Sequence, residues 1–285
     1  MREVRVKAPA KINLTLEVLG KREDGFHNIQ SIMQAISLYD YLTVTIEASD
    51  ELKIELLGTS KEIPYDSSNL VYKAAMKFVE AANIKDFKIR VFIEKNIPIA
   101  AGLAGGSTDA AATFFALNHL FSNVLSKEKI GELCASLGSD LNFCLDGGCA
   151  LCTSRGELIE KLPQVPHFLL SLIKPKAFGI SAKEAYTKFA KLEDRSNPNY
   201  TSVLKELIEQ NKFDKKYLYN SLEKAVINDY KELGEIKTKL PESIMSGSGP
   251  TFFVLKHFVE EPFERSRFDV IQGLESISDG VSIAE

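Results

Sequence analysis

The chain has 285 residues, of which 45% are hydrophobic and 26% charged, as is typical of a globular protein that can bury a core. This length predicts about two domains. The formal net charge of −4 and the pI near 5.8 argue against a nucleic-acid partner, because nucleic-acid binding requires a basic excess or a stripe of Lys and Arg.

The N-terminal residues 1–7 alternate charged residues with valine and lack the apolar segment of a signal peptide, so they predict an ordinary strand. No apolar run approaches the roughly 20 residues of a membrane span. We therefore expect a soluble protein without a membrane partner.

The first half of the chain predicts strands followed by helices. The segments that alternate or are rich in β-forming residues are 4–8, 12–19, 41–48, 52–57 and 87–95. Helices are predicted over 68–82, where Ser68 or Asn69 can cap, from the glycine-rich segment to Phe121, and over 126–138.

The small-residue segment 96–112 is the most informative part of the chain. It runs from an apolar strand through a loop with Gly102, Gly105 and Gly106 into a helix that begins near Ser107. Glycine permits close backbone approaches, and the free N–H groups and dipole of a helix start attract anions. The segment therefore predicts a cradle for a nucleotide polyphosphate. A helix start that needs small residues only for tight packing is the alternative.

This loop matches neither of two common nucleotide-binding patterns. A Walker A loop ends in Gly-Lys-Ser/Thr, and this segment has no lysine. Its glycines also miss the Gly-x-Gly-x-x-Gly spacing of dinucleotide-binding folds, so hydride transfer has no support from this segment.

Four cysteines follow this region: Cys134, Cys144, Cys149 and Cys152. The last two form a Cys-x-x-Cys pattern, which occurs in redox centres and as half of a zinc site. The histidines supply no second ligand pair at zinc-finger spacing, and both thiols lie in an apolar run. We therefore expect buried, reduced thiols in a strand and a reducing, cytoplasmic compartment.

The second half begins near Glu157 and is dominated by helical spacing. A strand over 168–173 precedes predicted helices over 181–190, 202–210, 213–225 and 230–239. The segment 244–255 places two glycines and Pro250 between apolar runs and predicts a tight hairpin. Its small hydroxyl residues could contact phosphate or only brace the first glycine loop.

Several motifs together resemble the galactokinase, homoserine, mevalonate and phosphomevalonate kinase (GHMP) superfamily over nearly the whole chain. The loop Pro98-Ile-Ala-Ala-Gly-Leu-Ala-Gly-Gly-Ser-Thr108 is similar to its Pro-x-x-x-Gly-Leu-x-x-Gly-Ser/Thr hallmark, and Gly247 and Gly249 match its late Gly-x-Gly turn. Pro9-Ala-Lys-Ile-Asn-Leu14 and Arg22-Glu-Asp-Gly-Phe-His27 resemble the branch that phosphorylates 4-diphosphocytidyl-2-C-methyl-D-erythritol, a step of non-mevalonate isoprenoid synthesis.

This resemblance implies transfer of a phosphoryl group from ATP to the 2-hydroxyl of that acceptor. It assigns catalysis to Lys11 and Asp140. A nearby ammonium favours the carboxylate form, so Asp140 can orient or deprotonate the hydroxyl, while Lys11 can also stabilise developing charge. Without the resemblance, a solvated lysine and a helix cap are the simpler interpretations.

The resemblance also implies the binding residues. The ATP-binding loop comprises Pro98, Ile99, Ala100, Ala101, Gly102, Leu103, Ala104, Gly105, Gly106, Ser107 and Thr108. For the acceptor, Asn13 is implied at the erythritol end, Phe26 and Tyr186 as aromatic walls for cytosine and His27 as the reader of its edge, with core packing as the alternative for the two rings.

Two positions depart from the family pattern. Asn142 stands where relatives commonly carry proline, and Thr108 stands where serine is common. Asparagine tolerates turn geometry and threonine keeps the hydroxyl, so we expect neither change to abolish activity.

The implied fold is α+β with two domains, an N-terminal ATP-binding domain of the ribosomal protein S5 domain 2 type over 1–155 and a ferredoxin-like domain over 156–285. ATP and the acceptor would meet between them. Magnesium is expected with ATP, with Ser107 as its protein contact and no dedicated metal site. The oligomeric state stays open.

Two other functions fit parts of the pattern. One is a related GHMP kinase acting on mevalonate, homoserine or a sugar, against which Asn13 and the Phe26-His27 pair argue. The other is a nucleotide-binding regulator that has lost turnover, since a fold alone does not fix function. The presence of both Lys11 and Asp140 argues against the regulator.

Overall fold

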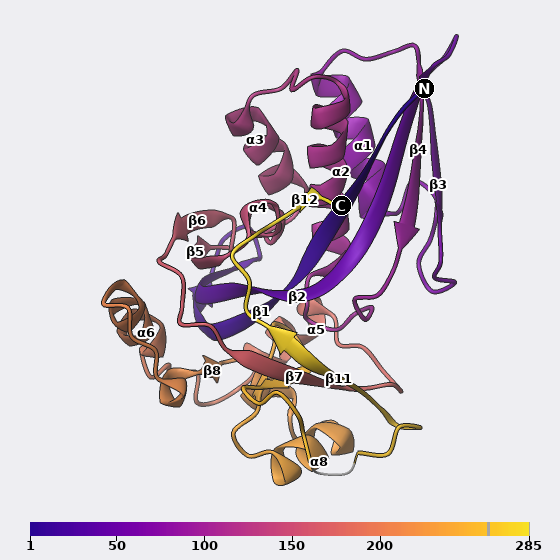
Figure 1. The fold of residues 1–285 in the computed structure, drawn as a ribbon. Helices are drawn as coiled ribbons and strands as arrows, with labels where there is room; N and C mark the ends of the chain where they lie inside the picture. The colour runs from indigo at the N-terminus through magenta and orange to yellow at the C-terminus, as the bar shows by residue number, and fades with distance from the viewer. Residues whose placement is uncertain (261–262, 285) are drawn as a thin grey trace.

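The computed structural model describes residues 1–260 and 263–284 and contains two β-sheets with helices packed against them (Figure 1). The strands are β1 (Arg2–Lys21), β2 (His27–Ala48), β3 (Lys53–Gly58), β4 (Phe87–Glu94), β5 (Cys149–Ser154), β6 (Leu158–Lys161), β7 (Leu169–Pro175), β8 (Tyr219–Asn220), β9 (Ile244–Met245), β10 (Phe252–Val254), β11 (Phe268–Glu275) and β12 (Ser282–Ile283). The helices are α1 (Leu70–Ala81), α2 (Gly105–Leu120), α3 (Lys127–Leu137), α4 (Leu141–Asp146), α5 (Ala182–Phe189), α6 (Tyr200–Glu209), α7 (Glu223–Val226) and α8 (Lys231–Lys239), with a short 3-10 helix over Lys215–Tyr217.

The larger sheet is built on the long antiparallel pair of β1 and β2. Its order is β12-β1-β2-β4-β3, with β5 pairing β2, β6 pairing β5 and β8 pairing β1. The smaller sheet has the order β11-β7-β10-β9. Because β1 pairs with strands from both halves of the chain, it links the beginning of the chain to its end.

Strand β1 passes through three parts of the core. Its apolar side chains alternate along the strand, while Lys11, Asn13, Thr15 and Glu17 on the opposite face are buried as well. They are Val4, Val6 and Ala8 in the first cluster, Ala10, Ile12 and Leu14 in the second, and Leu16 and Val18 in the third. The sequence predicts two strands here, and the structure has one, with register shifts that include one between Pro9 and Ala10. Proline cannot donate to the ladder, so a bulge lets the strand continue past it.

Helices α1, α2 and α3 lie beside the long strands at the N-terminal end of the molecule (Figure 1). Most of α2 is buried, and its alanines allow close contact with β1, β2 and α1. The predicted helix starts are confirmed by side-chain caps: Asn69 accepts a hydrogen bond from the N–H of Val71, and Ser126 accepts one from the N–H of Lys129.

The predicted helix over 213–225 is wrong. The chain there forms the 3-10 turn, then β8, and then the short helix α7. Strand β8 pairs parallel to β1, with Tyr219 opposite Thr15, so tertiary pairing overrides the local helical spacing. The sequence analysis also did not predict β6, β11, β12 or α4, and its strand over 41–48 is the end of the longer β2.

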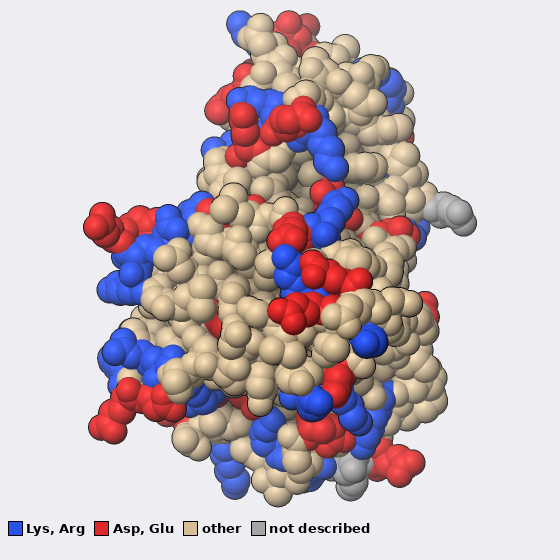
Figure 2. Space-filling model, turned by 90° about the vertical axis from the view of Figure 1, so that its left-hand side faces the viewer, with Lys and Arg blue, Asp and Glu red and all other residues tan. Residues whose placement is uncertain are grey.

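The surface mixes charges of both signs. On the face shown in Figure 2, acidic and basic side chains lie next to one another over much of the molecule. Several form ion pairs between elements, such as Lys205 with Glu160 at 2.7 Å. Within the described residues, no helix combines the length and apolar character needed to cross a membrane.

Candidate active site

A pocket of about 1260 Å³ lies where β1, the β1–β2 turn, the glycine-rich loop, α5 and the turn at 247–248 meet. Its lining includes Lys11, Asn13 and Asp140, and also Phe26, His27 and Tyr186. Nine of the eleven predicted loop residues line it: Pro98, Ile99, Ala100, Ala101, Gly102, Ala104, Gly105, Gly106 and Ser107. Folding therefore gathers residues from widely separated parts of the chain around one cavity.

Leu103 and Thr108 are the two predicted loop residues that do not line the pocket. Leu103 is 1% exposed and packs in the core, while its carbonyl oxygen accepts a hydrogen bond from the backbone N–H of Lys11 at 3.2 Å. Thr108 is fully buried in the first turn of α2. Both side chains thus pack into the protein interior and support the loop without lining the pocket.

The glycine-rich loop has an unusual backbone. Ala100, Gly102 and Ala104 have φ angles of 50°, 74° and 61°, all in the left-handed region. This conformation costs about 1–2 kcal/mol for a residue with a side chain, and such strain gathers at functional sites. Helix α2 begins at Gly105, two residues earlier than the sequence suggests, and no side chain caps its free N–H groups. The loop and helix start together form a backbone site suited to an anion.

The late glycine turn braces this loop. The Ser246 hydroxyl donates to the carbonyl oxygen of Gly102 at 3.0 Å. A Cβ atom at Gly102 would lie 2.0 Å from the Ser246 carbonyl oxygen, so only glycine fits there. Gly247 and Ser248 in addition line the pocket, so the turn both supports the loop and borders the cavity.

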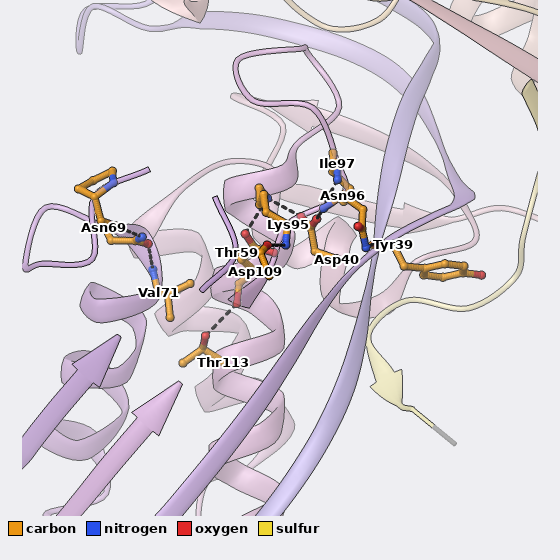
Figure 3. Close-up of polar contacts among 11 residues, drawn as sticks. Tyr39, Asp40, Thr59, Asn69, Val71, Lys95, Asn96, Ile97, Asp109 and Thr113 are labelled. Carbon is orange, nitrogen blue, oxygen red and sulfur yellow. Dashed lines mark hydrogen bonds and ion pairs between the residues drawn. The ribbon is translucent and has the colours of Figure 1, made fainter. Parts of the chain in front are cut away.

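A buried ionic cluster holds both ends of the loop (Figure 3). The Lys95 ammonium lies between two carboxylates. It donates a hydrogen bond to Asp40 and another, 2.7 Å long, to Asp109 of α2. Asp40 also accepts hydrogen bonds from the N–H groups of Asn96 and Ile97, at 2.6 and 2.8 Å. The cluster therefore connects the start of the loop to the first turns of α2.

Burial raises the pKa of Asp109 well above its usual range, and the Asp40 carboxylate adds to this effect against the opposing Lys95 charge. Burial alone would lower the pKa of Lys95, but the two carboxylates raise it. These three residues were not predicted from the sequence, because Asp40 and Lys95 are 55 residues apart. The only sequence signal was an aspartate two residues after Ser107.

Lys11 and Asp140 form an ion pair, with Nζ and Oδ2 3.7 Å apart. Lys11 lies on β1 with its side chain almost fully buried, and Asp140 precedes α4. The ammonium also donates to Oδ1 of Asn13 at 2.7 Å and to the Gly102 carbonyl at 3.1 Å. Asn13 in turn donates to the Ser31 hydroxyl at 2.7 Å, which fixes its amide. A buried cation is thus held between a carboxylate and the glycine loop.

The aromatic residues lie at another end of the pocket. His27 and Tyr186 stack with ring centroids 5.1 Å apart and an interplanar angle of 20°. Phe26 is 52% exposed, and the Arg155 guanidinium lies 5.0 Å from its ring centroid. Burial, together with the charge of Lys21, lowers the pKa of His27, which keeps its imidazole neutral near pH 7. This end of the pocket can hold a planar base.

Known proteins resemble this chain in sequence and in fold. The GHMP kinases N terminal domain family matches residues 69–148. The 4-diphosphocytidyl-2-C-methyl-D-erythritol kinases of Clostridium tetani (strain Massachusetts / E88) and Clostridium acetobutylicum are each 41% identical over 256 residues, which cover 88% of this chain and 90% of theirs.

Solved structures agree with the sequence relatives. The crystal structure of a 4-(cytidine 5'-diphospho)-2C-methyl-D-erythritol kinase is 31% identical with a TM-score of 0.71, covering 88% of this chain and 89% of that one. The homoserine kinase of Cytophaga hutchinsonii superposes with a TM-score of 0.76 at 18% identity, covering 100% and 98%, and so shares the fold. The predicted GHMP kinase fold is thereby confirmed, and the chain belongs to the 4-diphosphocytidyl-2-C-methyl-D-erythritol kinase family of the GHMP kinases.

Proposed function

We propose that this protein transfers the γ-phosphoryl group of ATP to the 2-hydroxyl of 4-diphosphocytidyl-2-C-methyl-D-erythritol, releasing ADP and the 2-phosphate. The observation that carries the proposal is the Lys11–Asp140 ion pair at 3.7 Å, in one pocket with the glycine loop and with Phe26, His27 and Tyr186. The names of the relatives point to the same acceptor.

The ATP phosphates would lie against the glycine-rich loop and the start of α2, where uncapped N–H groups face the pocket. Magnesium would arrive with ATP and offset the phosphate charge. The described residues hold no group of three metal-ligating side chains, and Asp109 is engaged by Lys95, so phosphate oxygens would supply most magnesium ligands. Ser107, which lines the pocket in the first turn of α2, would be the protein contact of that ion.

At the reacting end, Asp140 would hold the 2-hydroxyl and accept its proton as the phosphoryl group transfers. Lys11, 3.7 Å from Asp140, would stabilise the negative charge that spreads over the transferring group. Asn13, bonded to the Lys11 ammonium, would fix the ammonium and contact the erythritol end of the acceptor. Positioning and electrostatics supply most of the catalysis in this reaction class.

At the other end, the cytosine would lie among Phe26, His27 and Tyr186. An aromatic ring offers a face for stacking a base. The lowered pKa of His27 keeps the ring neutral, so it can offer one donor and one acceptor to the base edge. This combination favours a pyrimidine-linked acceptor over a plain polyol.

We also propose a reducing, cytoplasmic location. The four cysteines are free and buried, and Cys149 and Cys152 lie on β5, where the sequence predicts strand thiols. Burial raises the pKa values of Cys134 and Cys149 to about 12. Such thiols are protonated and unreactive, which suits a compartment without disulfide formation.

The proposal predicts that Asp140→Asn loses about 100- to 10,000-fold in turnover, as expected for a lost proton acceptor, while ATP still binds. ADP release and calorimetric titration with ATP measure the two effects separately. Asp146→Asn is the matched control, because this carboxylate ends the same helix α4 and pairs with Lys127 at the surface. Undiminished turnover of Asp140→Asn would remove Asp140 from its proposed role.

A further inference from the structure

Arg155 lies in a turn that approaches both the aromatic residues of the pocket and Asp140. It follows β5 directly, lines the pocket, and stands over the Phe26 ring at 5.0 Å. Its neighbour Gly156 lies against the catalytic carboxylate, since a Cβ atom there would be 4.0 Å from Oδ1 of Asp140. The turn thus places a cation near the aromatic residues and near the reacting group.

The guanidinium is hydrogen-bonded to Glu157, and the Asp24 carboxylate of the pocket also feels its charge. The backbone N–H of Arg155 donates to Oε2 of Glu157 at 2.8 Å, and its Nε donates to Oε1 at 3.4 Å. Within residues 1–260 and 263–284, this guanidinium donates hydrogen bonds through Nε alone. The two terminal nitrogens can therefore still donate hydrogen bonds to the oxygens of a ligand. The side chain is 29% exposed, so its charge is partly desolvated but reachable from the pocket.

The proposed acceptor carries a diphosphate between its cytidine and its methylerythritol. If the base lies at Phe26 and the hydroxyl at Asp140, the diphosphate would pass this turn, because Arg155 lies over the Phe26 ring and Gly156 approaches Asp140. Arginine matches phosphate oxygens with two parallel hydrogen bonds. Apart from Lys11 and Lys95, the other cations that line the pocket are Lys21, Lys183 and Lys191, which are exposed lysines on flexible stems. The planar, partly buried guanidinium of Arg155 is a better match to a diphosphate than these lysine ammonium groups.

We propose that Arg155 binds the diphosphate of the acceptor and so selects a nucleotide-linked polyol over a free one. This inference rests on the proposed function, because it takes the acceptor from it. The contact would be made in the ground state, so Arg155 is a specificity residue for the acceptor. It would leave ATP binding unchanged.

A purely structural role for Arg155 is the competing explanation. In that case Arg155 would only brace Phe26 and the β1–β2 turn. Arg22 provides the matched control, because it braces the same turn by donating to Asn28 at 2.9 Å and to Ser154 at 3.0 Å and does not line the pocket. If Arg155 only braces this turn, its loss should lower the affinity for every ligand at this end of the pocket by the same factor.

The test compares cytidine 5'-diphosphate with cytidine by calorimetric titration, with a non-hydrolysable ATP analogue saturating the ATP site. The unchanged protein should bind the diphosphate more tightly than the nucleoside. Arg155→Gln should lower the affinity for the diphosphate about tenfold or more, as expected for lost charge-assisted hydrogen bonds, without changing the affinity for cytidine. Arg155→Lys, which keeps the charge but not the fork, should show part of this loss.

Equal losses for both ligands in Arg155→Gln, matched by Arg22→Gln, would overturn the proposal. So would equal affinities of the unchanged protein for the two ligands, or an unaltered diphosphate affinity in Arg155→Lys. Turnover of the full acceptor by the unchanged protein is measured separately. Its absence would overturn the proposed function, whereas a diphosphate preference lost in Arg155→Gln would still support the role of Arg155.

Discussion

Lys11 is a buried cation on a strand whose neighbours are core residues. Its ammonium lies 3.7 Å from Asp140, 2.7 Å from the Asn13 amide oxygen and 3.1 Å from the Gly102 carbonyl. Burying a charge is unfavourable unless it is paired and hydrogen-bonded, and this lysine is both. Burying the Lys11 ammonium costs free energy, and the phosphoryl transfer proposed for the pocket gives a reason for this charge to be kept there.

Lys11→Met removes the charge while keeping the unbranched side chain. We expect kcat to fall by about 100- to 1,000-fold, the usual effect of losing one group that stabilises transition-state charge. The midpoint of thermal unfolding should fall as well, because the Asn13 amide oxygen and the Gly102 carbonyl lose their donor and Asp140 loses its cation. Steady-state kinetics and thermal unfolding check the two parts. A kcat equal to that of the parent would contradict the role given to Lys11.

Asp109 predicts a pH dependence of stability. Burial raises the pKa of Asp109 in the folded protein above the usual 3.8. The contribution of Asp109 to the free energy of unfolding is therefore fully present below pH 3.8 and is lost as the pH rises through the raised pKa. The neighbouring Lys95 has a raised pKa and stays charged throughout this range. The parent should therefore lose free energy of unfolding as the pH rises towards alkaline values.

Asp109→Asn should remove this slope, because the amide does not titrate. Urea unfolding of parent and variant at pH values from about 5 to 9 measures the difference. Parallel curves for the two proteins would show that Asp109 does not titrate as its surroundings imply.

The sequence could predict most of the residues that gather around the pocket, but not all of their partners. Lys11, Asp140 and the glycine loop lie in short motifs whose residue types are fixed by chemistry. Asp40 and Arg155 belong to no such motif, because they act through contacts that exist only after distant segments pack together. A charged residue is usually solvated, so sequence alone gives no reason to single them out.

At the scale of elements, the glycine loop depends on the close approach of the Gly102 backbone to the Ser246 carbonyl. In Gly102→Ala the added Cβ would meet the Ser246 carbonyl at 2.0 Å, at a φ angle of 74°. We expect a loss of at least about 2 kcal/mol in the free energy of unfolding, from strain and a displaced loop, and a weaker affinity for ATP. Urea unfolding and ATP titration measure both effects.

Gly234→Ala on α8 is the matched control for this substitution. A Cβ there meets nothing within 4 Å, and alanine favours a helix over glycine by roughly 0.8–1 kcal/mol. The control should therefore be as stable as the parent or more stable. If Gly102→Ala behaved like Gly234→Ala, the loop would not be held as described.

Secondary structure was predictable where local signals agreed with packing. The caps at Asn69 and Ser126 and the small hairpin of β9 and β10 follow from residues a few positions apart. The helix expected over 213–225 was wrong because pairing of β8 with β1 depends on residues some 200 positions away. Bulges such as the one at Pro9 likewise depend on the partner strand, so one long strand looked like two.

At the scale of the whole molecule, the last strand closes the first sheet. Strand β12 pairs antiparallel with β1, with Ile283 opposite Val6, and the N–H of Ala284 donates to the Arg5 carbonyl at 2.8 Å. The two ends of the chain are thereby tied together. A division at residue 155 stays a prediction, since β8 and β12 of the second half both pair with β1.

Truncation before Ser282 should expose the edge of β1. We expect a loss of about 1–3 kcal/mol in the free energy of unfolding, with little change in kcat, because the pairing ends at Lys7, before Lys11. Ile283→Thr is the control: its side chain is 47% exposed and its backbone pairing is kept, so its effect should be smaller. Equal stability of the truncated and parent proteins would show that β12 does not support the sheet.

The two ends of the pocket make one claim about the whole molecule, that ATP and a cytidine-linked polyol react across it. The most direct measurement is ADP release with magnesium and ATP in the presence of 4-diphosphocytidyl-2-C-methyl-D-erythritol, its uridine counterpart, mevalonate or homoserine. We predict turnover of the cytidine compound alone, with the new phosphate on the 2-hydroxyl. Turnover of mevalonate or homoserine instead, or of none of the four while ATP binds, would contradict the account.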